Sequence, residues 1–204
     1  MASYPAELSE LRRLVALRLS PARYRHTEGV LDAAQALAGR YGADVRRAEV
    51  AALVHDLERE RPAGELLRLA EGFGFPVHAV ERDRPMLLHG PVAARTAPAE
   101  LGVTDPEVLR AVAVHTTGAA PMSLLDQVIY LADYIEPGRD FPGVAELRRL
   151  AEQDLRRACL AATEATLRYV LTRRELIHPR TVEARNWLLS GLGEPGGTRL
   201  AELE

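Results

Sequence analysis

An imidazole and a carboxylate stand next to each other at the end of an apolar run in this sequence. The pair is His55-Asp56, and it follows the apolar residues 50–54. Both groups are costly to bury at the end of a helix unless they have partners. A divalent cation removes that cost, because it takes an imidazole and a carboxylate as ligands. The alternative is a histidine at a helix C-terminus beside a solvated aspartate, and the pair alone does not decide between the two.

Two residues elsewhere in the chain can complete a metal site around this pair. His26 lies near the start of the preceding predicted helix, and an antiparallel helix pair with a short connection brings it beside His55. Asp133 is a second carboxylate in an apolar helix, although each residue alone is more often a hydrogen-bonded core group. Together they give a mixed nitrogen and oxygen ligand set that suits iron, manganese, cobalt or zinc. The predicted metal ligands are His26, His55, Asp56 and Asp133.

Two more histidines follow apolar segments and precede turn residues. His89 is followed by a Gly-Pro pair, and His115 by Thr-Thr-Gly. Both can therefore point into a cleft, although they can also be capping or core histidines. Beside a metal centre, a second metal or a phosphate oxygen is the better interpretation. Of the remaining histidines, we expect His78 in an exposed connection and His178 at a turn or helix cap.

Helical periodicity runs through most of the chain, and β-branched runs are scarce. Asp44, Asp105 and Pro179 mark helix starts, and the Glu-Pro-Gly turn at 136–138 ends a strongly apolar helix over residues 123–135. We expect roughly eight to ten helices joined by short turns. The predicted fold class is therefore all-α, a helical bundle.

Composition sets the domain organisation and limits the partners. Of the 204 residues, 47% are hydrophobic, which predicts one domain over residues 1–190 with a flexible, Gly/Pro-rich tail over residues 191–204. The net charge of -3 argues against a nucleic-acid partner. A membrane partner is not expected either, since no apolar run reaches the roughly 20 residues of a membrane span. The single cysteine, Cys159, allows no intrachain disulfide, which favours the cytoplasm.

The order of the site motifs resembles a known family. His26, His55-Asp56 and Asp133 follow the H…HD…D order of the HD-domain phosphohydrolases. The chain is also similar to the YqeK-type branch, whose members hydrolyse diadenosine tetraphosphate symmetrically, over about residues 8–190. The strings that carry this similarity are LHGP at 88–91, HTTG at 115–118 and LADYIEPGRD at 131–140.

The resemblance implies a single HD-domain helical bundle with a divalent transition metal, iron being preferred, as a mono- or dinuclear centre. Its implied metal ligands are again His26, His55, Asp56 and Asp133. Its implied catalytic residues are Asp56, His89 and His115. Its implied substrate-binding residues are Arg23, His26, Asp56, His89, His115, Asp133 and Arg139. The chain departs from many relatives at Arg59, where they have lysine, and we interpret Arg59 as a solvated helix residue beside Glu58 and Glu60.

The activity that the resemblance implies is hydrolysis of a dinucleoside polyphosphate substrate. Water attacks an inner phosphorus of diadenosine tetraphosphate, and two molecules of ADP are the product. A metal centre lowers the pKa of water from roughly 15.7 to about 7. The alternatives are another HD-type nucleotide phosphohydrolase (a nucleotidase or a phosphodiesterase) and a non-catalytic nucleotide sensor. The oligomeric state is left open, with a homodimer among the options.

Overall fold

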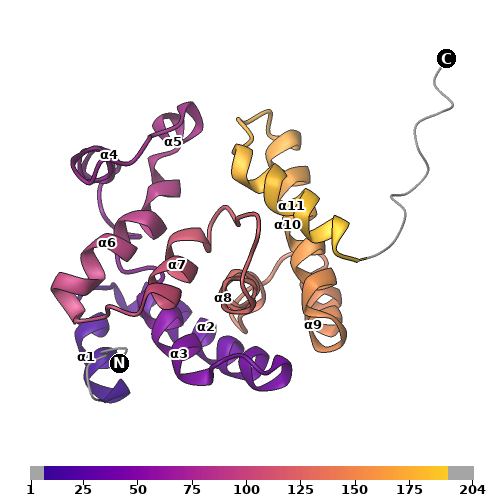
Figure 1. Ribbon diagram of the computed structural model, residues 1–204, viewed down its shortest axis with the longest axis horizontal. Helices are drawn as coiled ribbons and strands as arrows, with labels where there is room; N and C mark the ends of the chain where they lie inside the picture. The colour runs from indigo at the N-terminus through magenta and orange to yellow at the C-terminus, as the bar shows by residue number, and fades with distance from the viewer. Residues whose placement is uncertain (1–6, 193–204) are drawn as a thin grey trace, which may run out of the picture.

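Helices form all the regular secondary structure between residues 7 and 192, the part of the chain that the computed structural model describes. The predicted all-α fold class is confirmed (Figure 1). The elements are α1 (Leu8–Ala16), α2 (Pro21–Tyr41), α3 (Val45–Val54), α4 (Ala63–Gly72), α5 (Ala79–Asp83), the 3-10 helix η1 (Pro85–Leu88), α6 (His89–Leu101), α7 (Pro106–Val114), α8 (Leu124–Ile135), α9 (Val144–Gln153), α10 (Leu155–Thr172) and α11 (Pro179–Ser190).

Local signals in the sequence fix many of the helix ends. Asp44 and Asp105 are N-caps, and their carboxylates accept hydrogen bonds from backbone N–H groups of the first turn, as the sequence predicted. Ser123 begins α8 with a capping box, which satisfies otherwise unpaired amides. Gly42 ends α2 in the left-handed region (φ 74°), where a residue without a Cβ is favoured. These ends determine which residues face the centre of the bundle.

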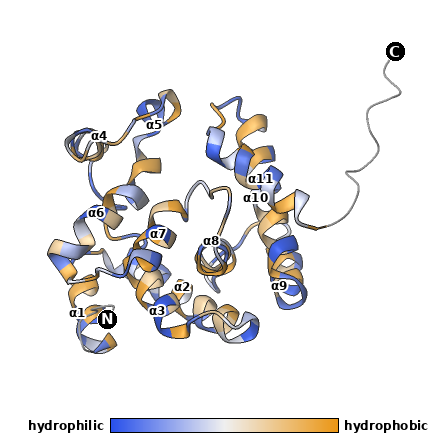
Figure 2. Cartoon of the chain, in the orientation of Figure 1, coloured by the Kyte–Doolittle hydropathy of each residue, from blue (hydrophilic) through white to orange (hydrophobic). Residues whose placement is uncertain are grey.

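The core is built around α8, which packs against α2, α3, α7 and α10. Figure 1 shows α8 end-on in the middle of the molecule, and Figure 2 shows it as largely hydrophobic. Val128, Ile129 and Leu131 are fully buried in it, and each such side chain contributes about 1.5–3 kcal/mol relative to exposure. Asp133 lies on this same helix, so the central, most buried helix of the core carries a candidate metal ligand.

Two outer parts flank this core (Figure 1). The helices α4, α5 and η1 lie on one side, where Leu66, Ala70, Leu88 and Val92 form a small second hydrophobic cluster. On the other side α9, α10 and α11 pack together, and α10 joins them to α8. None of the helices between residues 7 and 192 combines the length and the apolar character that a membrane span requires.

The structure corrects two details of the sequence prediction. Residues 7–192 hold eleven α-helices and one 3-10 helix, more than expected, because the chain from residue 79 to 101 folds into three further helical elements. His89 was expected before a turn, but it is the first residue of α6, with Gly90 and Pro91 in the first helical turn. Pro is tolerated there because its missing N–H would have no intrahelical acceptor. The division into a domain over residues 1–190 and a tail over residues 191–204 stays a prediction, and residues 193–204 lie outside the described residues.

Candidate metal centre

Six side chains from five parts of the bundle meet beside the N-terminal half of α2. They are His26 in α2, His55 and Asp56 directly after α3, His89 at the start of α6, His115 directly after α7, and Asp133 in α8. Their candidate ligand atoms form three groups among the described residues, each with all atoms within 4.8 Å: His26, His55 and Asp56; His55, His115 and Asp133; Asp56, His89 and His115. The fold therefore brings together all four predicted metal ligands and both additional histidines.

Three of the four histidines are oriented by the helix that each one ends. His55, His89 and His115 are the C-cap residues of α3, η1 and α7. Each ring points its Nδ1 at the carbonyl oxygen three residues earlier, and a carbonyl can only accept, so Nδ1 carries the hydrogen. The Nε2 atoms are left facing the centre. The acceptors are Ala52 O for His55 (2.6 Å), Met86 O for His89, and Val112 O for His115 (2.7 Å).

His26 is oriented differently, because it lies inside α2 and not at a helix end. Its Nδ1 lies 3.1 Å from Oε1 of Glu136, and its Nε2 lies 3.1 Å from Oδ1 of Asp133 and 3.5 Å from Oδ2 of Asp56. Its ring centroid is 5.5 Å from that of His55, as the predicted antiparallel pairing of α2 and α3 requires. Sequence reasoning did not select Glu136 as a site residue. The available signal was its place in the string that also contains Asp133.

Asp56 is buried in the middle of the cluster and touches groups on both of its oxygens. Oδ1 lies 3.0 Å from Nε2 of His89, and Oδ2 accepts a hydrogen bond of 2.9 Å from Arg23. Burial alone would raise the pKa of Asp56, but His55 and His89 outweigh it and hold that pKa well below its ordinary value. Asp56 is therefore an ionised carboxylate at neutral pH.

Asp133 and His115 are also held in the protonation states that a metal ligand needs. Burial would raise the pKa of Asp133, but His26, His55 and Arg139 keep it below its ordinary value. Arg139 donates to the side chain of Asp133 and, through Nε, to its backbone carbonyl at 2.8 Å. Burial and the neighbouring histidines lower the pKa of His115 to about 3, so its ring is neutral.

These donor atoms fit a divalent cation. The buried Nε2 atoms of His26 and His55 make no hydrogen bond to any residue from 7 to 192, although carboxylate oxygens lie 3.1–3.5 Å away. The Nε2 atoms of His89 and His115 face each other at 3.0 Å. Lone pairs directed at one another repel unless a proton or a cation lies among them. A cluster of imidazole nitrogens and carboxylate oxygens is a ligand set for a divalent transition metal.

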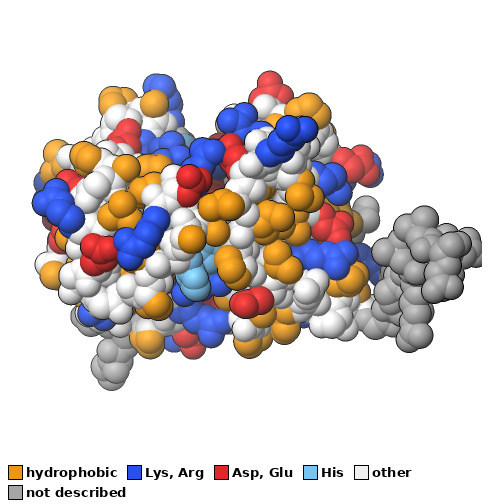
Figure 3. All heavy atoms as spheres, turned by 90° about the horizontal axis from the view of Figure 1, so that it is seen from above, with side chains coloured by type: hydrophobic (Ala, Val, Ile, Leu, Met, Phe, Trp, Pro, Cys, Tyr) orange, Lys and Arg blue, Asp and Glu red, His pale blue; other side chains and the backbone are white. Residues whose placement is uncertain are grey.

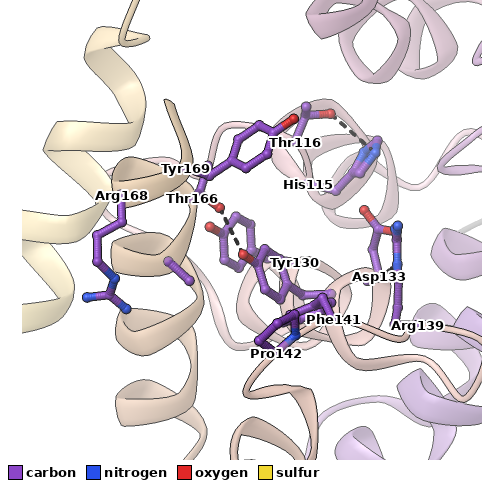
Figure 4. A pocket seen from close by; sticks show the side chains of 12 residues that line it. His115, Thr116, Tyr130, Asp133, Arg139, Phe141, Pro142, Thr166, Arg168 and Tyr169 are labelled. Atoms are coloured by element: carbon purple, nitrogen blue, oxygen red, sulfur yellow. Dashed lines mark hydrogen bonds and ion pairs between the residues drawn. The ribbon is translucent and has the colours of Figure 1, made fainter. Parts of the chain in front are cut away.

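A pocket of about 630 Å³ begins at this cluster and runs toward α10. His115, Asp133 and Arg139 form one wall, and Figure 4 shows their side chains on the opposite side of the pocket from Arg168, with Tyr169 beside Thr116. Thr116 lies beside the cluster, with its hydroxyl 3.3 Å from Nε2 of His115 (Figure 4). The remaining lining is mainly aromatic and hydroxyl-bearing: Tyr130, Tyr134, Phe141, Pro142, Ala165, Thr166 and Arg168.

The predicted nucleotide-contacting arginines both lie at the cluster. Arg23 pairs with Asp56 and Arg139 with Asp133, as described above. Arg59 lies in the turn after α3 and not in a helix, and its neighbour Glu58 is buried against Thr96. The prediction that Arg59 lies on a solvated helix face is therefore wrong.

Figure 3 shows basic and acidic side chains interspersed on one face of the molecule, without a basic stripe.

The other candidates behave as the sequence indicated. His78 is exposed at the start of α5. His178 is the N-cap of α11, with Nδ1 accepting the backbone N–H of Arg180 at 3.1 Å. Neither histidine belongs to the three groups of candidate metal ligands among residues 7–192. Cys159 is buried, and burial raises the pKa of its thiol, so it is an inert core residue.

Comparison with known proteins identifies the class of domain. Residues 23–138 match the family model described as HD domain. This range contains all six residues of the cluster and Glu136. The helices that end at the cluster therefore belong to an HD domain.

Relatives define the family more closely. Two proteins named symmetrical bis(5'-nucleosyl)-tetraphosphatase are 42% identical over 85% of this chain and 93% of the relative (Bacillus subtilis), and 40% identical over 87% and 94% (Halalkalibacterium halodurans). A crystal structure of an HD superfamily hydrolase described as involved in NAD metabolism, from Clostridium acetobutylicum, aligns with a TM-score of 0.87 and 38% identity. It covers 91% of this chain and 98% of the other. The chain belongs to the HD-domain family of symmetrical bis(5'-nucleosyl)-tetraphosphatases.

Proposed function

We propose that this protein hydrolyses dinucleoside tetraphosphates symmetrically, converting diadenosine tetraphosphate and water into two ADP. One observation carries the proposal. His115 and Asp133 belong to the metal-binding cluster and also line the aromatic pocket. A phosphate at the cluster and a nucleoside in the pocket can therefore be parts of one ligand. The names of the relatives support the same substrate.

The pocket suits a nucleoside in size and in lining. Its volume of about 630 Å³ falls within the range of roughly 300–1,000 Å³ that small-molecule sites occupy. Tyr134, Phe141 and Tyr169 provide aromatic faces, and a base gains stacking energy on such faces whatever its identity. Thr116 and Thr166 provide hydroxyl groups for ribose or base edges. We therefore assign one nucleoside of the substrate to this pocket.

The cluster would hold a divalent transition metal, and we propose iron, through His26, His55, Asp56 and Asp133. Because the three groups of candidate ligands share members, His89 and His115 can extend the site to a second ion. A divalent cation supplies positive charge opposite the phosphate oxygens and makes a nearby water more acidic.

The remaining chemistry is positioning and charge neutralisation by side chains. Asp56 is ionised and is held through Oδ2 by Arg23, so we propose that it orients the attacking water and accepts its proton. The water oxygen forms a bond to an inner phosphorus, and the bond from that phosphorus to the bridging oxygen breaks. ADP leaves with the electron pair and is a good leaving group. We propose that Arg139 offsets the negative charge that develops on the phosphate oxygens, and that His89 and His115 act through the second ion that their Nε2 atoms would hold.

The test is product analysis with the protein purified without oxygen and its metal content measured. Two ADP per diadenosine tetraphosphate supports the proposal. ATP plus AMP, or release of inorganic phosphate from nucleotides, overturns it in favour of another HD-type phosphohydrolase. Tight nucleotide binding without turnover in the metal-loaded protein overturns it in favour of a sensor. A cytoplasmic location stays a prediction, supported by the free buried Cys159.

A further inference from the structure

Three of the four histidines of the cluster are oriented by a hydrogen-bond acceptor on their own helix, and the fourth, His26, has no such acceptor. His55, His89 and His115 point Nδ1 at carbonyl oxygens in the last turn of their own helices, where carbonyls have lone pairs that the helix itself does not use. His26 is the sixth residue of α2, a helix of 21 residues, so the carbonyls around it are used by the helix itself. It needs an acceptor from another part of the chain. Glu136, 110 residues later in the sequence, provides it at 3.1 Å.

Glu136 is itself fixed in place by the turn that follows α8. Glu136 is only 5% exposed, and its Oε2 accepts a hydrogen bond from the backbone N–H of Gly138 at 2.5 Å. Arg148, on α9, donates to the carbonyl oxygens of Ile135 (2.8 Å) and Glu136 (2.7 Å), and so closes the turn from outside. With one oxygen on Gly138 and the other on His26, both carboxylate oxygens of Glu136 have a donor.

Gly29 leaves the space that this carboxylate occupies. A Cβ added at Gly29 would lie 2.6 Å from Oε2 of Glu136 and 3.4 Å from its Cδ. Gly29 follows His26 by three residues on the same face of α2. Gly39, on the same helix, has no atom within 4 Å of its added Cβ among the described residues, so it has no comparable packing reason to be glycine.

We propose that Glu136 is a positioning residue that sets the ring of His26 for metal binding, and that Gly29 is the residue that admits it. The carboxylate accepts the Nδ1–H of His26, which fixes the ring orientation and leaves Nε2 directed at Asp56 and Asp133. The inference rests on the metal site of the proposed function, not on its substrate. Partners of this kind change metal affinity or activity by about 10–100-fold when they are removed.

The experiment titrates Co²⁺ into the metal-free protein under nitrogen and records the affinity and the visible absorption bands, which report the ligands around cobalt. Glu136→Ala should weaken Co²⁺ binding about 10- to 100-fold and change the bands. The Co²⁺ affinity of Glu136→Gln should fall between that of the original protein and that of Glu136→Ala. An amide has only one acceptor oxygen, whereas both His26 and Gly138 donate to the carboxylate. Gly29→Ala should reproduce the loss without touching the carboxylate chemically. Gly39→Ala is the matched control and should bind Co²⁺ as the original protein does.

The proposal is overturned if Glu136→Ala, folded by circular dichroism, binds Co²⁺ with unchanged affinity and bands. If Glu136→Ala does not fold, Gly29→Ala decides: unchanged Co²⁺ binding in that variant overturns the proposal, and weakened binding relative to Gly39→Ala supports it. Failure of the proposed function gives a different result. In that case the original protein produces no ADP from diadenosine tetraphosphate, while the order of Co²⁺ affinities among the variants remains.

Discussion

The Nε2 atoms of His89 and His115 lie 3.0 Å apart, although the two residues are on different helices. This approach depends on Gly90, because a Cβ there would lie 2.8 Å from the carbonyl oxygen of Val112 and 3.1 Å from the His115 ring. The same carbonyl of Val112 accepts the Nδ1–H of His115. One missing side chain thus sets both the separation of α6 and α7 and the place of a candidate ligand.

Gly90→Ala should therefore push α6 away from α7 at the cluster. We expect a loss of about 1–3 kcal/mol in the free energy of unfolding, because the Cβ meets backbone and not a flexible side chain. Hydrolysis should fall about 10-fold or more, since the two histidines separate. Urea denaturation and initial-rate assays measure the two effects. Gly64→Ala is the control, and equal behaviour of the two variants would refute the packing role of Gly90.

Asp133→Ala should remove a proposed metal ligand and release Arg139 at the same time. We expect kcat/KM for diadenosine tetraphosphate to fall by more than the roughly 10–100-fold that is typical of a residue that only orients a ligand. Nucleotide binding should be partly retained, because the aromatic wall of the pocket is untouched. The control is Asp32→Ala on the exposed face of α2. Turnover of Asp133→Ala at the original rate would show that the metal assignment is wrong.

Tyr169→Ala should weaken substrate binding with a smaller effect on the chemical step. Tyr169 lines the pocket and is 59% exposed without substrate, so its ring is available to a base. Loss of stacking of about 1–3 kcal/mol corresponds to a rise in KM of roughly 5- to 150-fold. Leu171→Ala is the matched control, because Leu171 is 60% exposed on the same helix and does not line the pocket. Equal KM values for the two variants would show that Tyr169 does not belong to the proposed nucleoside site.

The stability of the fold should depend on pH through His178. Burial lowers the pKa of His178 below its ordinary value of 6.5, with Glu81 acting in the opposite direction. Its Nδ1 accepts the N–H of Arg180, so a proton on Nδ1 breaks the cap of α11. The unfolded chain therefore binds this proton more readily, and the stability that His178 contributes is present above pH 6.5 and is lost as the pH falls below it.

His178→Asn separates this effect from the other histidines. Asn is a good N-cap and does not titrate, so the variant should lose less stability than the original protein between pH 7.5 and pH 5. The measurement is the free energy of unfolding at each pH on metal-free protein. Both proteins keep the other five histidines, so the difference between the two curves reports the cap at position 178. A His178→Asn curve parallel to the original would contradict the assignment.

The sequence predicted those parts of the site that leave a local signal. His55, Asp56 and Asp133 are polar residues in apolar helical runs, and that contrast is visible without a structure. The antiparallel pairing of α2 and α3 followed from a short connection and was also predictable, so His26 could be added. The all-α fold followed from the period of the apolar residues.

The parts that could not be predicted depend on contacts between distant segments or on ambiguous local signals. Glu136 resembles the end of a helix in the sequence, and its contact with His26 exists only because α2 crosses the end of α8. Gly90-Pro91 is a common turn signal, but the same pair is compatible with a first helical turn. Deciding between the two needs the packing of α6 against α7, which no local pattern contains.

Three of the cluster histidines stand where a helix stops, and this arrangement limits how the protein can change over evolutionary time. An α-helix turns by about 100° per residue and a 3-10 helix by about 120°, so one residue inserted or deleted within α3, η1 or α7 would carry its histidine away from the centre. Insertions in the connections between these helices leave every ring where it is. We expect homologous chains to vary in loop length and to keep the length of these three helices. Gaps in an alignment of such chains should therefore fall in the connections, away from the site.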